Sequence, residues 1–176
     1  MSITRIDWKR TIYLGQPHEE EAYGIGPASS EALVRGISSF GGMRPIYIIL
    51  NNNGGEDDEA RFSLDIIRSC PQNIIGVVCG RAESAAAWIL QGCDWRVMMP
   101  RSSMMLHMGS SVKDAHSEWA EKMFVDDVLQ RMQEKDPTYP RNKLMKELKR
   151  DWHLYPTQAL ALGLIDQIWE PTYGKA

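Results

Sequence analysis

The chain has 176 residues, of which 43% are hydrophobic, and its 20 basic and 23 acidic side chains give a formal net charge of −3 at pH 7. This length and composition predict one domain, residues 1–176, with a substantial core. A nearly balanced charge without a basic stripe argues against nucleic acid as the main partner. No apolar run approaches the length of a membrane span, and residues 1–8 lack the apolar core of a signal peptide, so we expect neither a membrane partner nor export.

Strand-like and helix-like segments alternate along the chain, with no internal repeat. The strand-like segments are short apolar runs at 10–15, 46–50, 74–79, 95–99 and 103–107. The helix-like segments lie at 30–40, 57–69, from 85 onward, and at 112–135, 141–150 and 157–162. A loop is expected at 16–29. The alternation predicts an α/β fold built from stacked βαβ units.

Ser84 lies where one apolar run, 74–80, ends and another, 85–90, begins. This position predicts a junction between a strand and a helix, where the free N–H groups of the first helical turn lie beside the serine hydroxyl. A nucleophile for acyl transfer is useful at such a corner. A serine in front of a helix more often only caps it, so the position alone does not separate a cap from a nucleophile.

Three other segments add to this pattern. The turn at 51–55 contains two glycines and follows a buried strand, so it can aim a backbone N–H at a substrate carbonyl. His107 ends a short apolar segment and is placed to act as a base. Asp151 follows a basic helix end and could orient the imidazole. His153 is a rival base, two residues further on.

Taken in order, these motifs resemble those of the Clp protease proteolytic subunit (ClpP) family, including the ClpP-like head-maturation proteases of phages. The matching segments are the Asn-x-x-Gly-Gly turn at 51–55, the Gly-x-Ala-x-Ser-Ala-x-Ala segment at 80–87, Met-Leu-His at 105–107, and the Asp with its Leu, Ala and Gly-Leu-Ile-Asp tail at 151–166. The resemblance covers about residues 10–169 and implies the ClpP/crotonase-like architecture.

The resemblance also implies a serine endopeptidase that acts on peptides or unfolded proteins without a cofactor. Ser84 matches the nucleophile, His107 the general base and Asp151 the acid that holds the histidine tautomer. Backbone N–H groups of Gly55 and Ala85 match the oxyanion hole.

The chain departs from the usual family pattern in ways that leave substrate preference open. Asn52 and Asn53 stand where the family usually has Ser-Pro, and the acidic run 56–59 follows the glycines. We expect this run to pair with the helix dipole. Arg81 and Glu83 precede the nucleophile where small or amide residues are common. None of these changes removes Ser84, His107 or Asp151.

The helix expected at 112–135 has more apolar residues than one narrow stripe needs, so part of it is expected to meet a neighbouring subunit. These residues are Ala115, Trp119, Ala120, Met123, Phe124, Val128, Leu129 and Met132. In the resembling family this helix is the handle that joins two heptameric rings into a tetradecamer around a chamber. The alternative is a helix that lies only over the core of its own subunit.

The resemblance leaves a partner ATPase in doubt. About ten residues precede the first strand, whereas housekeeping members carry a longer N-terminal segment whose axial loops dock an AAA+ ATPase. An independent or phage-type peptidase therefore stays open, as does a ring or scaffold subunit that has lost turnover. An α/β-hydrolase is disfavoured because alanines flank Ser84 and the order is Ser, His, Asp. A Ser-Lys peptidase is disfavoured because His107 and Asp151 are both in place.

Cys70, Cys79 and Cys93 are odd in number and none has Cys-x-x-Cys spacing. They are typical of reduced core residues, which favours a cytoplasmic location. His18 has no second histidine at helical spacing, and His116 is expected on a helix surface, so we expect no metal site.

Overall fold

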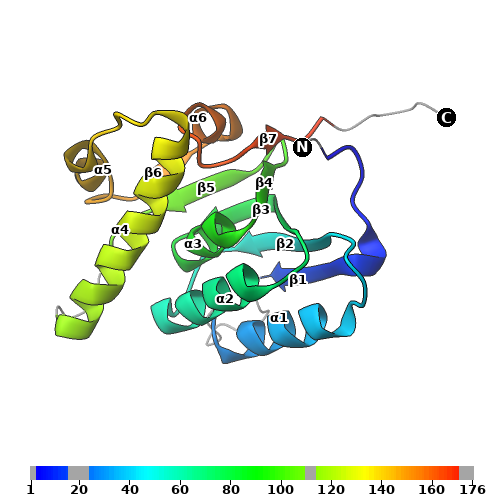
Figure 1. Cartoon of the computed structure of the whole chain (residues 1–176). Coiled ribbons are helices and arrows are strands. Elements are labelled where there is room, and N and C mark those ends of the chain that lie inside the picture. Colours follow the sequence, from blue (N-terminus) through cyan, green and yellow to red (C-terminus); the bar gives the residue numbers. More distant parts are fainter. Residues whose placement is uncertain (1–2, 16–23, 110–113, 171–176) are drawn as a thin grey trace.

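The computed structural model describes residues 3–15, 24–109 and 114–170, and its centre is a twisted, mainly parallel β-sheet (Figure 1). Its main path runs in the order β1 (Thr11–Gly15), β2 (Ile46–Asn52), β3 (Ile74–Glu83), β4 (Trp95–Met98) and β7 (Gln167–Ile168), with every neighbouring pair parallel. β5 (Ser103–Leu106) pairs in parallel with β3, and β6 (Trp152–Leu154) pairs antiparallel with β5.

The length of β3 decides where the site forms. Its first half, Ile75 to Val78, pairs with β4, and its last three residues, Arg81 to Glu83, pair with β5. The sheet therefore divides into two branches along β3. Ser84, the residue after β3, lies beside the end of β5 because of this division.

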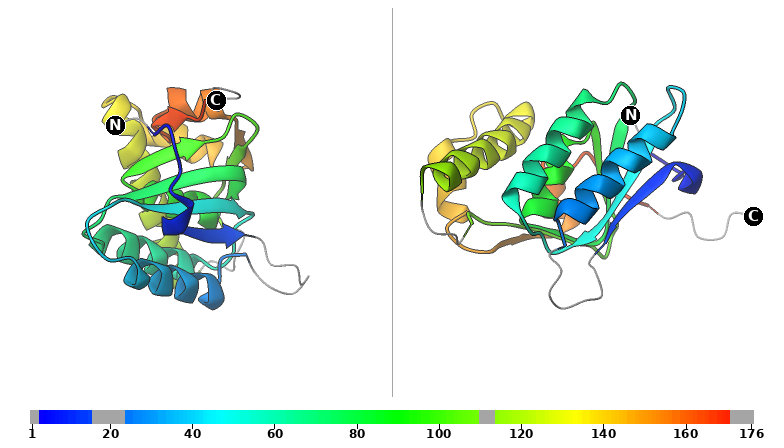
Figure 2. Two further views of the ribbon diagram at one scale, coloured as in Figure 1. Left: turned by 90° about the vertical axis from the view of Figure 1, so that its right-hand side faces the viewer. Right: turned by 90° about the horizontal axis from the view of Figure 1, so that it is seen from below.

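Three helices cover one face of the sheet, as Figure 2 shows from below. They are α1 (Pro27–Ser39), α2 (Asp57–Ser69) and α3 (Ala85–Gly92). The long helix α4 (Ala115–Lys135) packs beside α3, and the short helices α5 (Arg141–Glu147) and α6 (Pro156–Ala161) follow it. A short 3₁₀ helix, Trp8–Arg10, precedes β1.

Both faces of the central strands are buried, as expected for parallel strands. In β2, Ile46, Ile48 and Leu50 face the helices and belong to the main core. Tyr47 and Ile49 point to the other face and join a smaller cluster with Ile3, Ile6, Ile75, Val77 and Val97. The N-terminal segment thus covers part of the face that the helices leave open.

Helix α3 is buried along its whole length, which fixes the position of its first residue. Trp88 packs edge-on against Phe124 of α4, with ring centroids 5.5 Å apart. The indole N–H of Trp88 donates to Asp127 of α4 at 2.7 Å, and Arg68 of α2 also contacts Asp127 at 2.7 Å. The carboxylate of Asp127 therefore links α2, α3 and α4 near the start of α3.

The α/β fold predicted from the sequence is confirmed, with corrections at several element ends. α1 begins at Pro27 instead of residue 30, because proline suits the first helical position. α5 ends at Glu147 rather than at 150. α4 begins at Ala115, after Asp114 caps it, and residues 112–113 lie outside the described part of the chain, as do residues 16–23 of the expected loop.

Two differences concern strands. β3 continues to Glu83 instead of ending at residue 79, because its last residues are held by β5 rather than by an apolar pattern of their own. β6 and β7 were not predicted, since segments of three and two residues are too short to show alternation.

Candidate active site

Ser84 adopts a strained backbone conformation at the turn from β3 into α3. Its φ of 51° is the one positive φ of a non-glycine residue in the described part of the chain. Its side chain makes no cap hydrogen bond to the helix, so the hydroxyl is not used as an ordinary N-cap. The N–H of Ser84 donates to the carbonyl of Met105 at 2.8 Å, and its carbonyl accepts from Trp88 at 3.0 Å. These bonds hold a conformation that costs roughly 1–3 kcal/mol.

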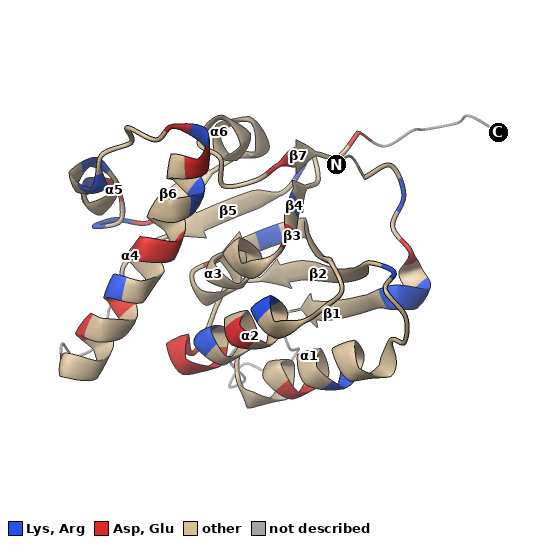
Figure 3. Cartoon of the chain, in the orientation of Figure 1, with Lys and Arg blue, Asp and Glu red and all other residues tan. Residues whose placement is uncertain are grey.

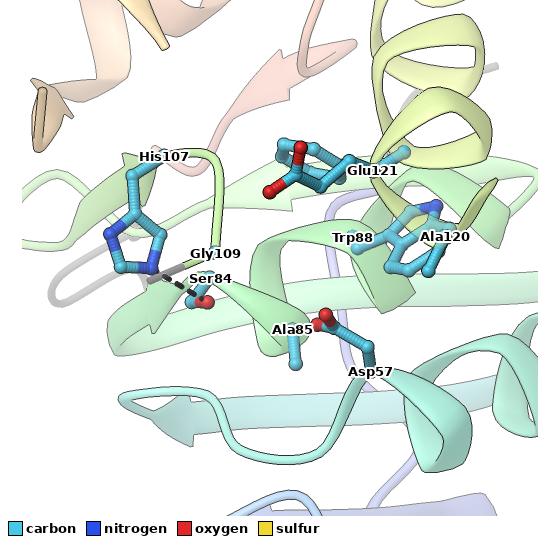
Figure 4. A pocket seen from close by; sticks show the side chains of 9 residues that line it. Asp57, Ser84, Ala85, Trp88, His107, Gly109, Ala120 and Glu121 are labelled. Carbon is cyan, nitrogen blue, oxygen red and sulfur yellow. Dashed lines mark hydrogen bonds between the residues drawn. The ribbon is translucent and has the colours of Figure 1, made fainter. Parts of the chain in front are cut away.

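His107 and Asp151 reach Ser84 through the pairing of β5 with β6. Leu106 pairs with Trp152 in this antiparallel ladder, so His107 and Asp151, the next residue on each side, lie opposite one another. The Nδ1 of His107 is 2.9 Å from Oδ1 of Asp151, and its Nε2 is 3.0 Å from Oγ of Ser84 (Figure 4). With the ring proton on Nδ1, His107 donates to Asp151 and accepts from the serine hydroxyl.

The glycine turn after β2 packs directly against the serine. A Cβ on Gly54 would lie 2.7 Å from Cβ of Ser84 and 2.8 Å from the carbonyl of Glu83, and the φ of Gly54 is 99°. Only glycine fits there. A parallel bridge ties the same turn to Ile25: the N–H of Ile25 donates to Gly54, and the N–H of Glu56 donates to Ile25, both at 2.9 Å.

Asn52 orders this turn, a role that the sequence did not indicate. Its side chain is fully buried, its amide donates to the carbonyl of Gly15 at 2.9 Å, and its Oδ1 accepts from the N–H of Gly54 at 2.8 Å. In place of the Ser-Pro expected from the resemblance, a buried amide thus links the end of β1 to the glycine turn. The signal available in the sequence was an asparagine two residues before the first of two glycines, a spacing at which an amide side chain can bond the backbone of its own turn.

A narrow pocket with a free volume of about 20 Å³, partly open to solvent, lies beside Ser84 and His107 (Figure 4). Ala85, Trp88, Ala120 and Phe124 form its apolar wall. Asp57 of α2 and Glu121 of α4 also line it. Neither acid was assigned to the site from the sequence.

The acidic run therefore does more than start a helix. Figure 3 shows acidic residues gathered at the beginning of α2. Asp57 is the first residue of this helix, where a carboxylate is favoured by the dipole as expected, but it also lines the pocket. Burial raises the pKa of the Asp57 carboxyl, and the charge of Arg61 opposes this shift.

The other residues singled out in the sequence lie away from the pocket. Glu83 is 4.0 Å from Arg81 on the same strand and does not line the pocket. His153 is exposed on β6, and the histidine that contacts Ser84 is His107. Burial raises the pKa of the Cys93 thiol to about 12, so it remains a neutral core side chain.

Two further expectations concern metals and membranes. Within the described ranges, no group of three or more His, Cys, Asp or Glu residues is arranged to hold a metal ion, and His18 lies outside those ranges. Among the helices of residues 3–15, 24–109 and 114–170, none is long and apolar enough to cross a membrane.

Comparison with known sequences identifies the family. The sequence model of the Clp protease matches residues 2–172, nearly the whole chain. The chain belongs to the Clp protease family. The family assignment made from the four motifs is thereby confirmed, and so is its enzyme class, a protease.

Curated relatives are similar over most of their length. The ATP-dependent Clp protease proteolytic subunit of Deinococcus radiodurans is 27% identical over 170 residues, covering 93% of this chain and 81% of the relative. Proteolytic subunit 2 of Prochlorococcus marinus subsp. pastoris is 27% identical over 173 residues, covering 94% and 84%. A solved ClpP1 mutant from Listeria monocytogenes superposes with a TM-score of 0.66 at 20% identity, covering 93% of this chain and 92% of the other, which shows the shared fold.

Proposed function

We propose that this Clp protease family member is a serine endopeptidase in which Ser84 is the nucleophile, His107 the general base and Asp151 the acid that orients it. The single observation that supports this best is the unbroken hydrogen-bonded chain from Asp151 through His107 to Ser84. The strained φ of Ser84 and its unused cap position support it further, because strain is retained where the surrounding structure has a reason to hold it.

The proposed reaction follows from these positions. His107 takes the hydroxyl proton as Oγ of Ser84 attacks the peptide carbonyl, and a tetrahedral intermediate forms. His107 then gives that proton to the leaving amine, which leaves an acyl-enzyme on Ser84. Water, activated by the same histidine, hydrolyses the ester and restores the free serine. Asp151 stabilises the imidazolium that exists between these steps and keeps the ring proton on Nδ1.

Ala85 and Gly55 are the proposed oxyanion donors. Ala85 is the first residue of α3, so its N–H has no partner within the helix. Gly55 lies in the turn between two residues that bond Ile25, and Gly54 brings this turn against the serine. An oxygen that becomes negative in front of Ser84 would lie between the helix start and the turn. Such a donor is worth about a hundred- to a thousandfold in rate.

We also propose that the subunits form heptameric rings that stack into a chambered tetradecamer, as the family resemblance implies. The exposed aromatic side chains of Trp8, Tyr13 and Trp119 support an assembly that covers them. The name of the Deinococcus relative, which describes it as ATP-dependent, supports an AAA+ ATPase as an additional partner. The three free cysteines fit a reducing cytoplasm.

The test is the replacement of the serine. Ser84→Ala should lower hydrolysis of a fluorogenic peptide about a thousandfold or more and abolish labelling by a fluorophosphonate. The free energy of unfolding should change by less than about 1 kcal/mol, since the hydroxyl makes no cap bond.

Ser39→Ala, at the exposed end of α1, is the matched control and should keep full activity. Turnover that survives in Ser84→Ala would contradict the assignment. A wild-type chain that neither hydrolyses peptides nor reacts with the fluorophosphonate would point to a subunit without turnover.

A further inference from the structure

Hydrogen bonds hold both peptide groups of Gly54, the residue before the proposed oxyanion donor Gly55. On one side, the N–H of Gly54 donates to Oδ1 of Asn52 at 2.8 Å. On the other side, the carbonyl of Gly54 accepts from the N–H of Ile25 at 2.9 Å. Gly54 has a φ of 99°, in a region that glycine enters freely, so its own backbone does little to fix the turn. The direction of the next N–H therefore depends on these two bonds.

The bond to Ile25 shows which way the Gly55 N–H points. The peptide between Gly54 and Gly55 is trans, so its carbonyl and its N–H point in opposite directions. Because the carbonyl of Gly54 points at Ile25, the N–H of Gly55 points away from it. Ile25 also lies very close: a Cβ on Gly55 would be 2.1 Å from its carbonyl oxygen. Any rotation of the Gly54–Gly55 peptide would thus turn the donor out of place.

Asn52 holds the other side of Gly54 and joins it to the end of β1. Its side chain is fully buried, and the amide nitrogen donates to the carbonyl of Gly15 at 2.9 Å while Oδ1 accepts from Gly54. Gly24 packs tightly against the same amide, because a Cβ there would lie 2.4 Å from Oδ1. A side chain that is bonded at both ends and enclosed in this way offers the Gly54 N–H an acceptor in a fixed place.

We infer that Asn52 is a positioning residue for the oxyanion hole: by accepting from the N–H of Gly54, it orients the next peptide so that the Gly55 N–H meets the negative oxygen of the tetrahedral intermediate. The inference rests on the proposed endopeptidase function. Asn52 acts through the glycine turn and not on the substrate. Because an oxyanion donor acts mainly on the transition state, a displaced donor lowers kcat and changes KM little.

The test uses Asn52→Ala and Asn52→Ser, which differ from each other by one oxygen. Alanine removes both hydrogen bonds of the amide. A serine hydroxyl can still accept from the N–H two residues further on, but it is too short to reach Gly15 as well. Asn52→Ala should lower kcat for a fluorogenic peptide about 10- to 100-fold and leave KM within about threefold. Asn52→Ser should keep kcat within about fivefold of the wild-type value, since the acceptor for Gly54 remains.

A peptide aldehyde gives a second readout, because its adduct with Ser84 places a tetrahedral oxygen where the oxyanion forms. Its inhibition constant should rise in Asn52→Ala by a factor similar to the fall in kcat/KM. Urea denaturation separates this effect from stability: both variants lose the bond to Gly15, so both should unfold at a lower urea concentration than the wild-type protein. If Asn52→Ala does not fold, Asn52→Leu, which fills the space without polar atoms, takes its place.

The control positions are provided by Asn73, which is exposed in the turn before β3. Asn73→Ala and Asn73→Ser should leave both kcat and the inhibition constant unchanged. Wild-type kcat in Asn52→Ala, or equal losses of kcat in Asn52→Ala and Asn52→Ser, overturns the positioning role while the endopeptidase proposal stands. If the wild-type protein cleaves no peptide and Ser84 does not react with a fluorophosphonate, the proposed function fails, and the inference fails with it.

Discussion

At the scale of single residues, the site depends on contacts that hold Ser84 in a conformation that it would not adopt alone. The N–H of Ser84 is fixed by Met105 on β5, and the α-carbon of Gly54 occupies the space next to its side chain. The same β5 carries His107 at its end. A shift of β5 relative to β3 would therefore move Ser84 and His107 together, which couples the strain of Ser84 to the geometry of the hydrogen-bonded chain from Ser84 through His107 to Asp151.

The side chains of Ser84, His107 and Asp151 should act as one catalytic unit, and variants that combine two substitutions test this. Ser84→Ala and His107→Ala should each lower kcat by orders of magnitude, and the double variant should lose little more than either single one, because residues of a triad are strongly non-additive. Asp151→Asn should also be nearly silent in a Ser84→Ala background. Steady-state hydrolysis over a long time course measures these rates. Losses that multiply would show that the residues have separate roles.

Local patterns in the sequence predicted Ser84, His107 and Asp151 as neighbours because each stands at the end of a recognisable segment. Asp57 and Glu121 could not be predicted in the same way. They are far apart in the chain, and they come together only because α2 and α4 both pack beside α3. Side chains that meet through helix packing have no common spacing in the sequence, so the acidic character of the pocket becomes visible only in three dimensions.

At the scale of elements, α4 shows that the number of apolar residues in a helix can overstate how much apolar surface the helix leaves exposed for a neighbouring subunit. Of the eight apolar residues noted in its sequence, Ala120, Phe124, Val128, Leu129 and Met132 are buried in the core of the same subunit, and Met123 is half-buried against it. Trp119, 52% exposed, is the large apolar side chain that the subunit leaves uncovered on this helix. The sequence predicted the helix from its period but could not divide its apolar face between the subunit's own core and solvent.

A buried ion pair helps to hold the C-terminal strand β7, which also pairs with β4. The guanidinium of Arg96 binds Asp166 through two hydrogen bonds of 2.8 and 2.9 Å, and a third goes to Gln91 at 3.0 Å. Asp166 also accepts from the backbone N–H of Arg96 at 2.8 Å. Removing the carboxylate leaves a buried guanidinium without its counter-charge, since only 4% of the Arg96 side chain is exposed.

We therefore expect Asp166→Ala to lower the free energy of unfolding by about 3–5 kcal/mol, as is typical when one partner of a buried pair is removed. Urea denaturation at a fixed protein concentration measures this change. The control is Asp126→Ala, which breaks an exposed pair with Arg141 and should cost about 1 kcal/mol or less. A similar small loss in Asp166→Ala would show that β7 is held by other contacts.

At the scale of the whole molecule, the sheet is covered unequally. The helices bury one face, while the N-terminal segment covers only part of the other, and the exposed aromatics Trp8 and Tyr13 lie at the start of the chain and on the edge strand β1. Trp119 is exposed on α4, which packs against α3. An edge strand and aromatic side chains left open in one subunit are the features that assembly would cover.

The proposed ring contact makes a direct prediction for Trp119. In the single subunit this side chain is exposed and contacts only the surface side chains of Arg61 and His116 through its ring, among the ring contacts of the described residues, so Trp119→Glu should leave the fold and its unfolding free energy nearly unchanged. If α4 joins two rings, the same change places an unpaired charge in their interface, which costs several kcal/mol and should split the particle into single rings or smaller species. Peptide hydrolysis should fall with it, because β5 carries His107 and leads toward α4.

Sedimentation velocity measures the mass of the particle. The control is Gln130→Glu, which changes an exposed residue on the same helix. An unchanged particle mass would place the ring contact away from Trp119, and a monomeric wild-type protein would remove the chamber altogether.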